Sequence, residues 1–183
     1  MKIVTTPMCE EILKWNNITE YTINKFPDEE EDIKIAILLS ESKTKHPSIR
    51  LKLNTFQQIK ESILKVHKNI DTEITSQDID LIFKKYPKAI EIIENLETYK
   101  KTNSKINIKV YSEFLKDIVA DLGFNIVDDK ANFVVYPDYM NIPKEDVKLI
   151  KISSHNNVSN NPIERAITRY LTIINKTQKW LNY

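Results

Sequence analysis

The sequence predicts an α/β protein with a mostly parallel sheet and helices on both faces of that sheet. Short apolar segments of strand length alternate along its 183 residues with segments whose apolar residues recur at helical spacing. Two largely apolar runs, at residues 33–39 and 132–136, are typical of strands buried on both faces. Strands that alternate with helices pair in parallel through right-handed crossovers, which gives the α/β class.

The first part of the chain is expected to form a β-α-β-β unit. Its expected elements are a strand at 2–5, a helix at 7–16, and strands at 21–24 and 33–39. Thr6 and Pro7 supply an N-cap and a first-turn proline for the helix. A short alternating strand at 49–53 follows this unit.

The same order of elements recurs after residue 105. The expected elements are a strand at 106–110, a helix at 113–122, and strands at 124–127 and 132–136. Ser112 is the expected N-cap of the helix and Gly123 its expected stop signal. Both parts therefore read β-α-β-β, which suggests an internal duplication that produced two small Rossmann-like lobes, residues 1–54 and 105–160.

Helices between residues 55 and 100 are expected to bridge the two lobes. Thr55 caps the first of them, and Pro87 begins the last or kinks a longer one. A strand at 147–152 and a terminal helix at 162–181 complete the chain. We expect the terminal helix to pack back on the lobes, so that residues 1–183 form a single compact unit.

Composition places the chain among globular proteins and excludes several classes. Apolar residues make up 41% of it and no apolar run approaches the roughly 20 residues of a membrane span, so we expect no membrane association. There is no signal-peptide pattern, and the single cysteine cannot form an internal disulfide, which favours a cytoplasmic location. The formal net charge of +1 makes nucleic acid an unlikely partner.

The scarcity of glycine, cysteine and histidine excludes several kinds of site. A single glycine cannot supply a P-loop or a GxGxxG turn, which need close backbone approach to phosphate. One cysteine excludes a thiolate zinc cluster, and the three histidines are scattered. We therefore expect no self-contained metal site, and the sequence leaves the cofactor undetermined.

Residues that follow the predicted strands are rich in hydroxyl groups. Ligands of open parallel sheets bind outside the carboxyl ends of the strands. The candidate ligand-binding residues at this edge are Thr6, Cys9, Ser40, Ser42, Ser112, Glu113, Ser153, Ser154 and His155. With helix N-termini at Pro7 and Glu113, they suit a small polar or anionic ligand. The alternative is that these residues only cap helices and form turns.

An enzymatic alternative uses Cys9 or Ser112 as nucleophile and His155 as base. Cys9 lies in the expected first turn of a helix, where the dipole lowers a thiol pKa, but Ile12 and Leu13 place it on the buried stripe. His155 would titrate near neutrality, although an exposed loop histidine without function is the alternative. Cys9 and His155 are therefore weak catalytic candidates, and no catalytic residue is assigned.

Two basic features of the sequence could bind an anion. Arg165 and Arg169 share a helical face, but a solvated surface pair is the expected arrangement because Ile163 and Ile167 lie opposite. The segment from Lys43 to Lys68 carries seven basic and two acidic residues. This excess could bind nucleic acid or another polyanion, or form a solvated face. The basic residues are Lys43, Lys45, Arg50, Lys52, Lys60, Lys65 and Lys68.

Two segments carry a resemblance to known proteins. The chain resembles an uncharacterised protein family of methanogenic archaea in its opening MKIVTTPMCEEILKW and in KVYSEFLKDIVADLGFNIVDDKANFVVYP. The second segment also looks like the strand-helix-strand starts of nitrogenase-like and chelatase-like two-lobed proteins. That resemblance implies a cleft between Rossmann-like lobes, but the cysteines that hold an iron-sulfur cluster are lacking. It concerns the fold and implies no chemistry.

Together these observations favour a non-enzymatic protein. The expected function is binding of a small polar or anionic ligand, or service as an accessory factor with a protein partner. The candidate edge offers hydrogen-bond donors and helix N-termini, but no convincing pair of nucleophile and base.

Overall fold

The computed structural model describes residues 2–142, 146–154 and 158–181. The chain divides into two compact units. Unit 1 consists of Met1–Pro87 and Ser159–Ile163, and unit 2 consists of Lys88–Val158 and Glu164–Tyr183. The predicted lobe boundaries at 1–54 and 105–160 and the internal duplication stay predictions.

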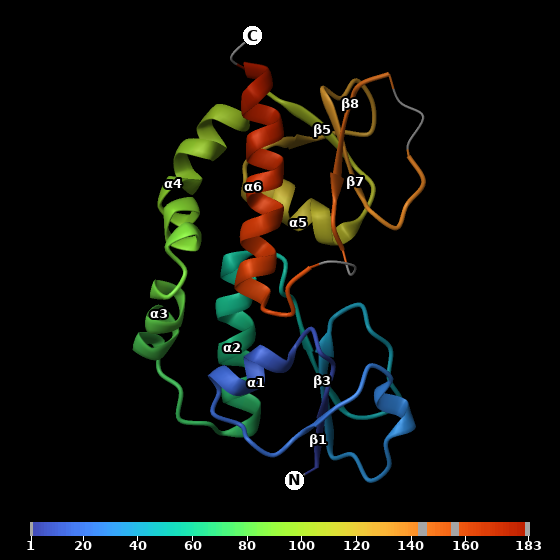
Figure 1. Ribbon diagram of the computed structural model, residues 1–183, viewed down its shortest axis with the longest axis vertical. Coiled ribbons are helices and arrows are strands. Elements are labelled where there is room, and N and C mark those ends of the chain that lie inside the picture. The colour runs from blue at the N-terminus through green and yellow to red at the C-terminus, as the bar shows by residue number, and fades with distance from the viewer. Residues whose placement is uncertain (1, 143–145, 155–157, 182–183) are drawn as a thin grey trace. The chain divides into compact units, whose positions relative to one another are not determined.

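Unit 1 contains a four-stranded, all-parallel sheet in the order β2-β1-β3-β4 (Figure 1). Its strands are β1 (Ile3–Thr5), β2 (Thr22–Ile23), β3 (Ile35–Leu39) and β4 (Ser48–Leu51). In the central strands Val4, Ala36, Ile37 and Leu38 are fully buried, as their apolar run predicts.

The helices of unit 1 differ in how they begin, and two of them have side-chain caps. They are α1 (Glu10–Trp15), a short 3₁₀ helix η1 (Pro27–Glu29), α2 (Phe56–Ile70) and α3 (Ser76–Lys84). The hydroxyl oxygens of Thr55 and Thr75 each accept a hydrogen bond from the backbone amide three residues later. The backbone amide of each threonine donates in return to the side chain of that later residue, so α2 and α3 both start with a capping box. The predicted role of Thr55 is thus confirmed. In Figure 1, α1 and α2 lie on the same side of β1 and β3.

Unit 2 repeats the strand order of unit 1. Its four-stranded parallel sheet runs β6-β5-β7-β8 (Figure 1). The strands are β5 (Asn107–Val110), β6 (Asn125–Ile126), β7 (Phe133–Pro137) and β8 (Lys148–Ile152). The helices are α4 (Pro87–Asn103), which begins at the last residue of the first segment of unit 1, α5 (Glu113–Asp121) and α6 (Pro162–Leu181). The predicted α/β class and the parallel pairing are therefore confirmed.

Gly123 lies just after the end of α5, as expected. Its φ of +79° lies in the left-handed region, and a Cβ there would approach the Lys100 Cα to 2.3 Å. Only glycine fits this position, because the turn after α5 passes directly against the backbone of α4.

The predicted start of one helix and the predicted capping bond of another need correction. Helix α1 begins at Glu10 rather than Pro7, because a turn closed by the bond from Cys9 N to Thr6 O (2.9 Å) precedes it. Thr6 is therefore not the N-cap. Ser112 does occupy the N-cap position of α5, but its side chain makes no capping hydrogen bond.

No helix within the described residues is long and apolar enough to cross a membrane.

Candidate ligand pocket

The predicted ligand-binding residues divide between the edges of two sheets. Thr6 and Cys9 follow β1, and Ser40 and Ser42 follow β3, so these four belong to unit 1. Ser112 and Glu113 lie at the start of α5, and Ser153 and Ser154 follow β8. These four residues belong to unit 2. His155 lies outside the described residues. A shared binding role for these residues stays a prediction.

In unit 1 the edge residues make bonds within the protein. The Cys9 side chain is fully buried, as core packing expects. The Ser40 hydroxyl donates to Glu41 at 3.0 Å. The Arg50 Nη1 donates to the carbonyl oxygens of Ser40, at 3.4 Å, and Ser42. The backbone at this edge is therefore held in place by a side chain from the neighbouring strand.

In unit 2 an arginine from α6 holds the edge. Arg169 Nε donates to the Ser153 carbonyl oxygen at 3.2 Å, and its Nη2 donates to that of Ser154 at 2.9 Å. The guanidinium carbon lies 4.7 Å from the centre of the Phe114 ring. The Ser154 amide donates to Asp138 at 3.0 Å, and the Ser154 hydroxyl donates to the same carboxylate oxygen.

The expectation of a solvated arginine pair is wrong. Arg165 is only 2% exposed and Arg169 only 5%. Helix α6 buries a wider arc than the apolar stripe indicates, and the flat guanidinium of Arg169 is satisfied there by two carbonyl oxygens. Burial in these surroundings gives Arg169 a structural role.

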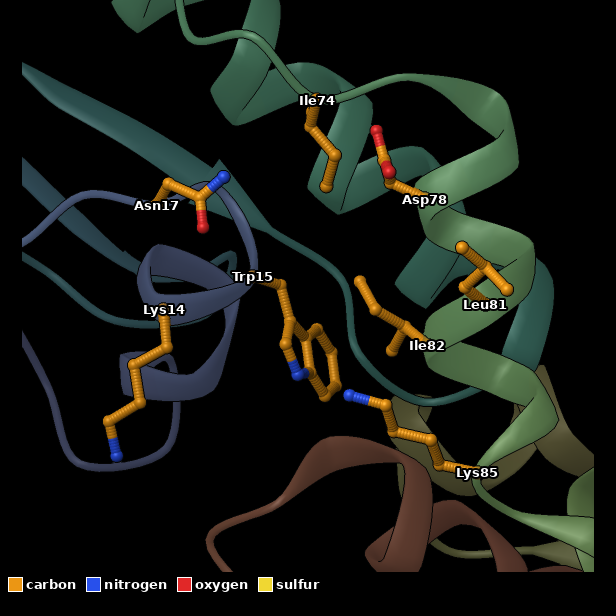
Figure 2. A pocket seen from close by; sticks show the side chains of 8 residues that line it. All are labelled: Lys14, Trp15, Asn17, Ile74, Asp78, Leu81, Ile82 and Lys85. Carbon is orange, nitrogen blue, oxygen red and sulfur yellow. The ribbon is translucent and has the colours of Figure 1, made fainter.

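A pocket lies in unit 1 between the end of α1 and helix α3 (Figure 2). We call it the Trp15 pocket. Its volume is about 290 Å³. It is lined by Lys14, Trp15, Asn17, Ile74, Asp78, Leu81, Ile82 and Lys85. None of these was a candidate from the sequence, because α1 and α3 are distant in the chain and only packing brings them together.

Local interactions fix both walls of the Trp15 pocket. Asn16, which follows Trp15, donates from its side-chain amide to the carbonyl oxygens of Ile12 (2.9 Å) and Ile63 (3.3 Å). On the other side, Phe83 of α3 packs edge-on against Phe56 of α2, with ring centres 6.3 Å apart. Both walls are therefore anchored to α2.

The middle of the Trp15 pocket is apolar. Trp15, Ile74, Leu81 and Ile82 supply this surface, and Leu81 is 56% exposed. Leu81 and the Trp15 indole both line the pocket, so a ligand with an apolar body would cover the exposed part of Leu81. The signal that sequence reasoning could have used is the run of three apolar residues, LIF, that begins at Leu81, because such a run is wider than one buried helix face.

The charged groups of the pocket lie toward its two ends. Figure 2 shows the Lys85 ammonium directed toward the Trp15 ring, with Asn17 and Asp78 toward the opposite end. Within the part of the chain that the structure describes, no carboxylate pairs with Lys85. Lys14, in contrast, contacts Glu10 and Glu11 at 2.8 Å each, and the hydrogen bond to Glu10 contributes most to raising its pKa.

Asp78 keeps its negative charge at neutral pH. Its Oδ2 accepts the Thr75 hydroxyl at 2.6 Å and the Thr75 amide at 2.8 Å. These bonds, the hydroxyl first, lower the pKa of the carboxyl group. The Trp15 pocket thus presents a cation toward one end and an anion toward the other.

The cations of the basic segment from Lys43 to Lys68 do not all border the same hollow. Lys60 reaches Asp80 at 3.4 Å and lies 4.9 Å from the centre of the Phe83 ring. Asp28 accepts the backbone amide of Lys45 at 3.0 Å. Three other cations, Arg50, Lys52 and Lys65, border a separate hollow.

Comparison with known proteins supports the fold and a family resemblance. Residues 102–182 match the model of the MJ0786 family C-terminal domain, so the second part of the chain resembles this family. No curated protein is similar enough in sequence to count as a match. The segment 109–137, on which the expected resemblance to an archaeal family rests in part, lies within the matched residues.

Solved structures share the fold at low sequence identity. A Zn(II)-bound variant of AdcAII from Streptococcus pneumoniae superposes with a TM-score of 0.57 at 9% identity, over 96% of this chain and 98% of that one. A periplasmic metal binding protein from Candidatus Liberibacter asiaticus gives 0.57 at 8% identity, over 96% and 99%. Its Mn-bound form gives 0.55 at 9% identity, over 96% and 99%. These neighbours are metal-binding proteins rather than the nitrogenase-like or chelatase-like proteins expected, and at such identity they show the fold alone.

The metal that these neighbours bind does not fit the described residues. Across residues 2–142, 146–154 and 158–181, no group of three or more histidine, cysteine, aspartate or glutamate side chains could hold a metal ion.

Proposed function

We propose that this protein binds a small zwitterionic ligand with an apolar body, the chemistry of a free apolar amino acid, in the Trp15 pocket. The protein binds the ligand without transforming it. The observation that carries the proposal is an apolar pocket lining of half-buried Trp15 and exposed Leu81, together with an ammonium group, Lys85, that has no carboxylate partner among the described residues.

The end near Lys85 suits a carboxylate. The Lys85 ammonium supplies a positive charge with three donors, and no described residue accepts a hydrogen bond from the Trp15 indole N–H. A ligand carboxylate would supply the acceptors that both groups need. Lys14 contributes little here, because Glu10 and Glu11 neutralise it.

The opposite end suits an ammonium group. Asp78 carries a negative charge, and its Oδ1 is not used by the Thr75 cap. The Asn17 side chain adds an amide oxygen to the same end. Charge of both signs toward opposite ends of an apolar wall favours a zwitterion over a simple anion, which Asp78 would repel.

The size of the pocket limits the ligand. Ligand sites commonly measure about 300–1,000 Å³. The Trp15 pocket, at about 290 Å³, is therefore matched to a molecule of amino-acid size rather than to a nucleotide.

Two further features support a binding protein over an enzyme. Cys9, one of the proposed nucleophiles, is buried. The fold is shared with metal-binding proteins, which supports ligand binding as the functional class. The ligand itself differs in this proposal, and we retain the cytoplasmic location that the sequence suggests.

The proposal is tested by fluorescence titration of the Trp180→Phe protein, in which Trp15 is the remaining tryptophan. Leucine is compared with 4-methylpentanoate, which lacks the ammonium group, and with isopentylamine, which lacks the carboxylate. We expect leucine to change the Trp15 emission and to bind at least about tenfold more tightly than either analogue, because each loses one charge interaction.

Substitutions assign the two ends. Lys85→Met should weaken leucine binding about tenfold but leave isopentylamine binding unchanged. Asp78→Asn should likewise weaken leucine binding about tenfold but leave 4-methylpentanoate binding unchanged. Lys84→Met is the matched control, since Lys84 is exposed on the same helix and does not line the pocket. Equal losses in Lys84→Met and Lys85→Met, or no response to leucine, would overturn the proposal.

A further inference from the structure

Half of the residues that border a second hollow of unit 1 are basic. It lies beside β4 and α2, has a volume of about 250 Å³, and shares no lining residue with the Trp15 pocket. We call it the Arg50 hollow. Its lining residues are Arg50, Lys52, Gln58, Glu61, Ser62 and Lys65.

We propose that Arg50 and Lys65 together bind a small phosphate-type anion in the Arg50 hollow, which Lys52 also lines. Three formal positive charges face one negative charge, that of Glu61. Glu61 itself accepts a hydrogen bond from Gln57 at 2.9 Å. Among the lining side chains, formal positive charges therefore outnumber negative ones, whereas the chain as a whole is nearly neutral.

Neutral backbone oxygens, rather than carboxylates, position two of these cations. Lys65 Nζ donates to the Arg50 carbonyl oxygen at 2.8 Å, and the Arg50 guanidinium donates to the carbonyl oxygens of Ser40 and Ser42. No carboxylate pairs with Arg50 or Lys65 among the residues described. Both side chains are therefore held near the hollow while their charges stay uncompensated, which is the arrangement that phosphate recognition uses.

The floor of the Arg50 hollow is also fixed. Ser62, which is buried on α2, donates its hydroxyl to the Lys52 carbonyl oxygen at 2.8 Å. This bond ties the segment after β4 to α2. Lys52 and Lys65 are consequently presented by two elements whose spacing is set before an anion binds.

The hollow fits a small anion better than a nucleic acid. Duplex binding requires several cations that follow the phosphate backbone. The other cations of this segment do not line the hollow, and Lys60 is engaged by Asp80 and Phe83. A cavity of about 250 Å³ accommodates one or two phosphate groups rather than a strand.

Isothermal titration calorimetry with inorganic pyrophosphate at low ionic strength tests the site. We expect wild-type protein to bind one pyrophosphate, and Lys65→Met to bind it about tenfold more weakly, because one uncompensated charge is lost. Lys68→Met is the matched control and should change the affinity less than twofold, since Lys68 is exposed on the same helix and does not line the hollow.

A second variant guards against a folding effect of the first. Arg50→Lys keeps the charge but loses the planar fork, and it should weaken pyrophosphate binding while leucine binding in the Trp15 pocket is unchanged. Equal loss in Lys65→Met and Lys68→Met, absence of pyrophosphate binding, or tighter binding of a 20-base-pair duplex than of pyrophosphate would each overturn the inference.

Discussion

The two units build the same sheet and then secure its carboxyl edge in different ways. Both have the strand order in which the first strand lies between the second and third, with the fourth at one edge. In unit 1 the arginine that binds the edge carbonyls, Arg50, comes from the edge strand β4 and is half-buried. In unit 2 the corresponding arginine, Arg169, comes from helix α6 and is buried.

This difference shows how a polar strand edge can be used for structure rather than for a ligand. The serines after β3 and β8 were expected to bind a ligand, yet their carbonyl oxygens already accept arginine hydrogen bonds in both units. A buried arginine must keep these bonds, whereas a half-exposed one can exchange them for water. The two edges should therefore respond differently to substitution.

The largest expected effect is that of removing Arg169. Arg169→Met should lower the free energy of unfolding by about 2–4 kcal/mol, because two buried carbonyl oxygens lose a charged donor and the Phe114 contact is lost. Arg50→Met should lower it by about 1 kcal/mol or less, since water can replace the guanidinium. Urea denaturation monitored by circular dichroism measures both, and equal losses would break the comparison between the edges.

A second difference concerns alkaline pH. The Tyr170 hydroxyl donates to Asp121, and burial, followed by the charge of Asp121, raises the pKa of this phenol. In the unfolded state the Tyr170 phenol releases its proton near pH 10, whereas in the folded state it does not. The contribution of Tyr170 to the free energy of unfolding is therefore complete below pH 10 and is lost as the pH rises above it. By pH 11 the loss is about 1.4 kcal/mol.

Tyr21 of unit 1 is the comparison for that prediction. Its pKa is also raised, by burial first, but its side chain is only partly buried and its bond to Glu10 is 3.4 Å long. Unfolding measured from pH 8 to pH 11 should show a smaller alkaline loss for Tyr170→Phe than for wild type, and nearly the wild-type loss for Tyr21→Phe. Identical curves for wild type and Tyr170→Phe would show that Tyr170 does not carry the effect.

The helix caps give the smallest expected difference. Thr55→Ala should cost about 1 kcal/mol, because the capping box of α2 is lost. Ser112→Ala should be neutral or slightly stabilising, since the Ser112 hydroxyl oxygen is buried and has no hydrogen-bond partner among the described residues. Thermal unfolding of the two variants compares them directly, and a larger loss for Ser112→Ala would reverse this interpretation.

Local signals in the sequence predicted most of the fold. The buried strands β3 and β7 follow from uninterrupted apolar runs, and Thr55 and Gly123 mark helix ends through chemistry that acts over a few residues. The start of α1 was misplaced because the Thr6-Pro7 pair suits a turn as well as a helix.

The candidate site could not be predicted in the same way. Trp15 and Lys85 are 70 positions apart and come together through tertiary packing, which includes the contact of Phe83 with Phe56. The burial of Arg169 likewise depends on carbonyl oxygens that precede it by 15 and 16 residues. Periodicity reports which face of one helix is apolar, but it does not report which polar groups another segment will bring to that helix.

The most direct test of the central claim is a heteronuclear NMR titration of the ¹⁵N-labelled protein with leucine. The indole N–H signal of Trp15, assigned with Trp15→Phe, and the backbone amide of Lys85 should shift together with a single dissociation constant. Amides at Ser40 and Ser154, on the two sheet edges, should stay unchanged. Shifts confined to the sheet edges, with the Trp15 and Lys85 signals unmoved, would contradict the proposal that the Trp15 pocket is the ligand site.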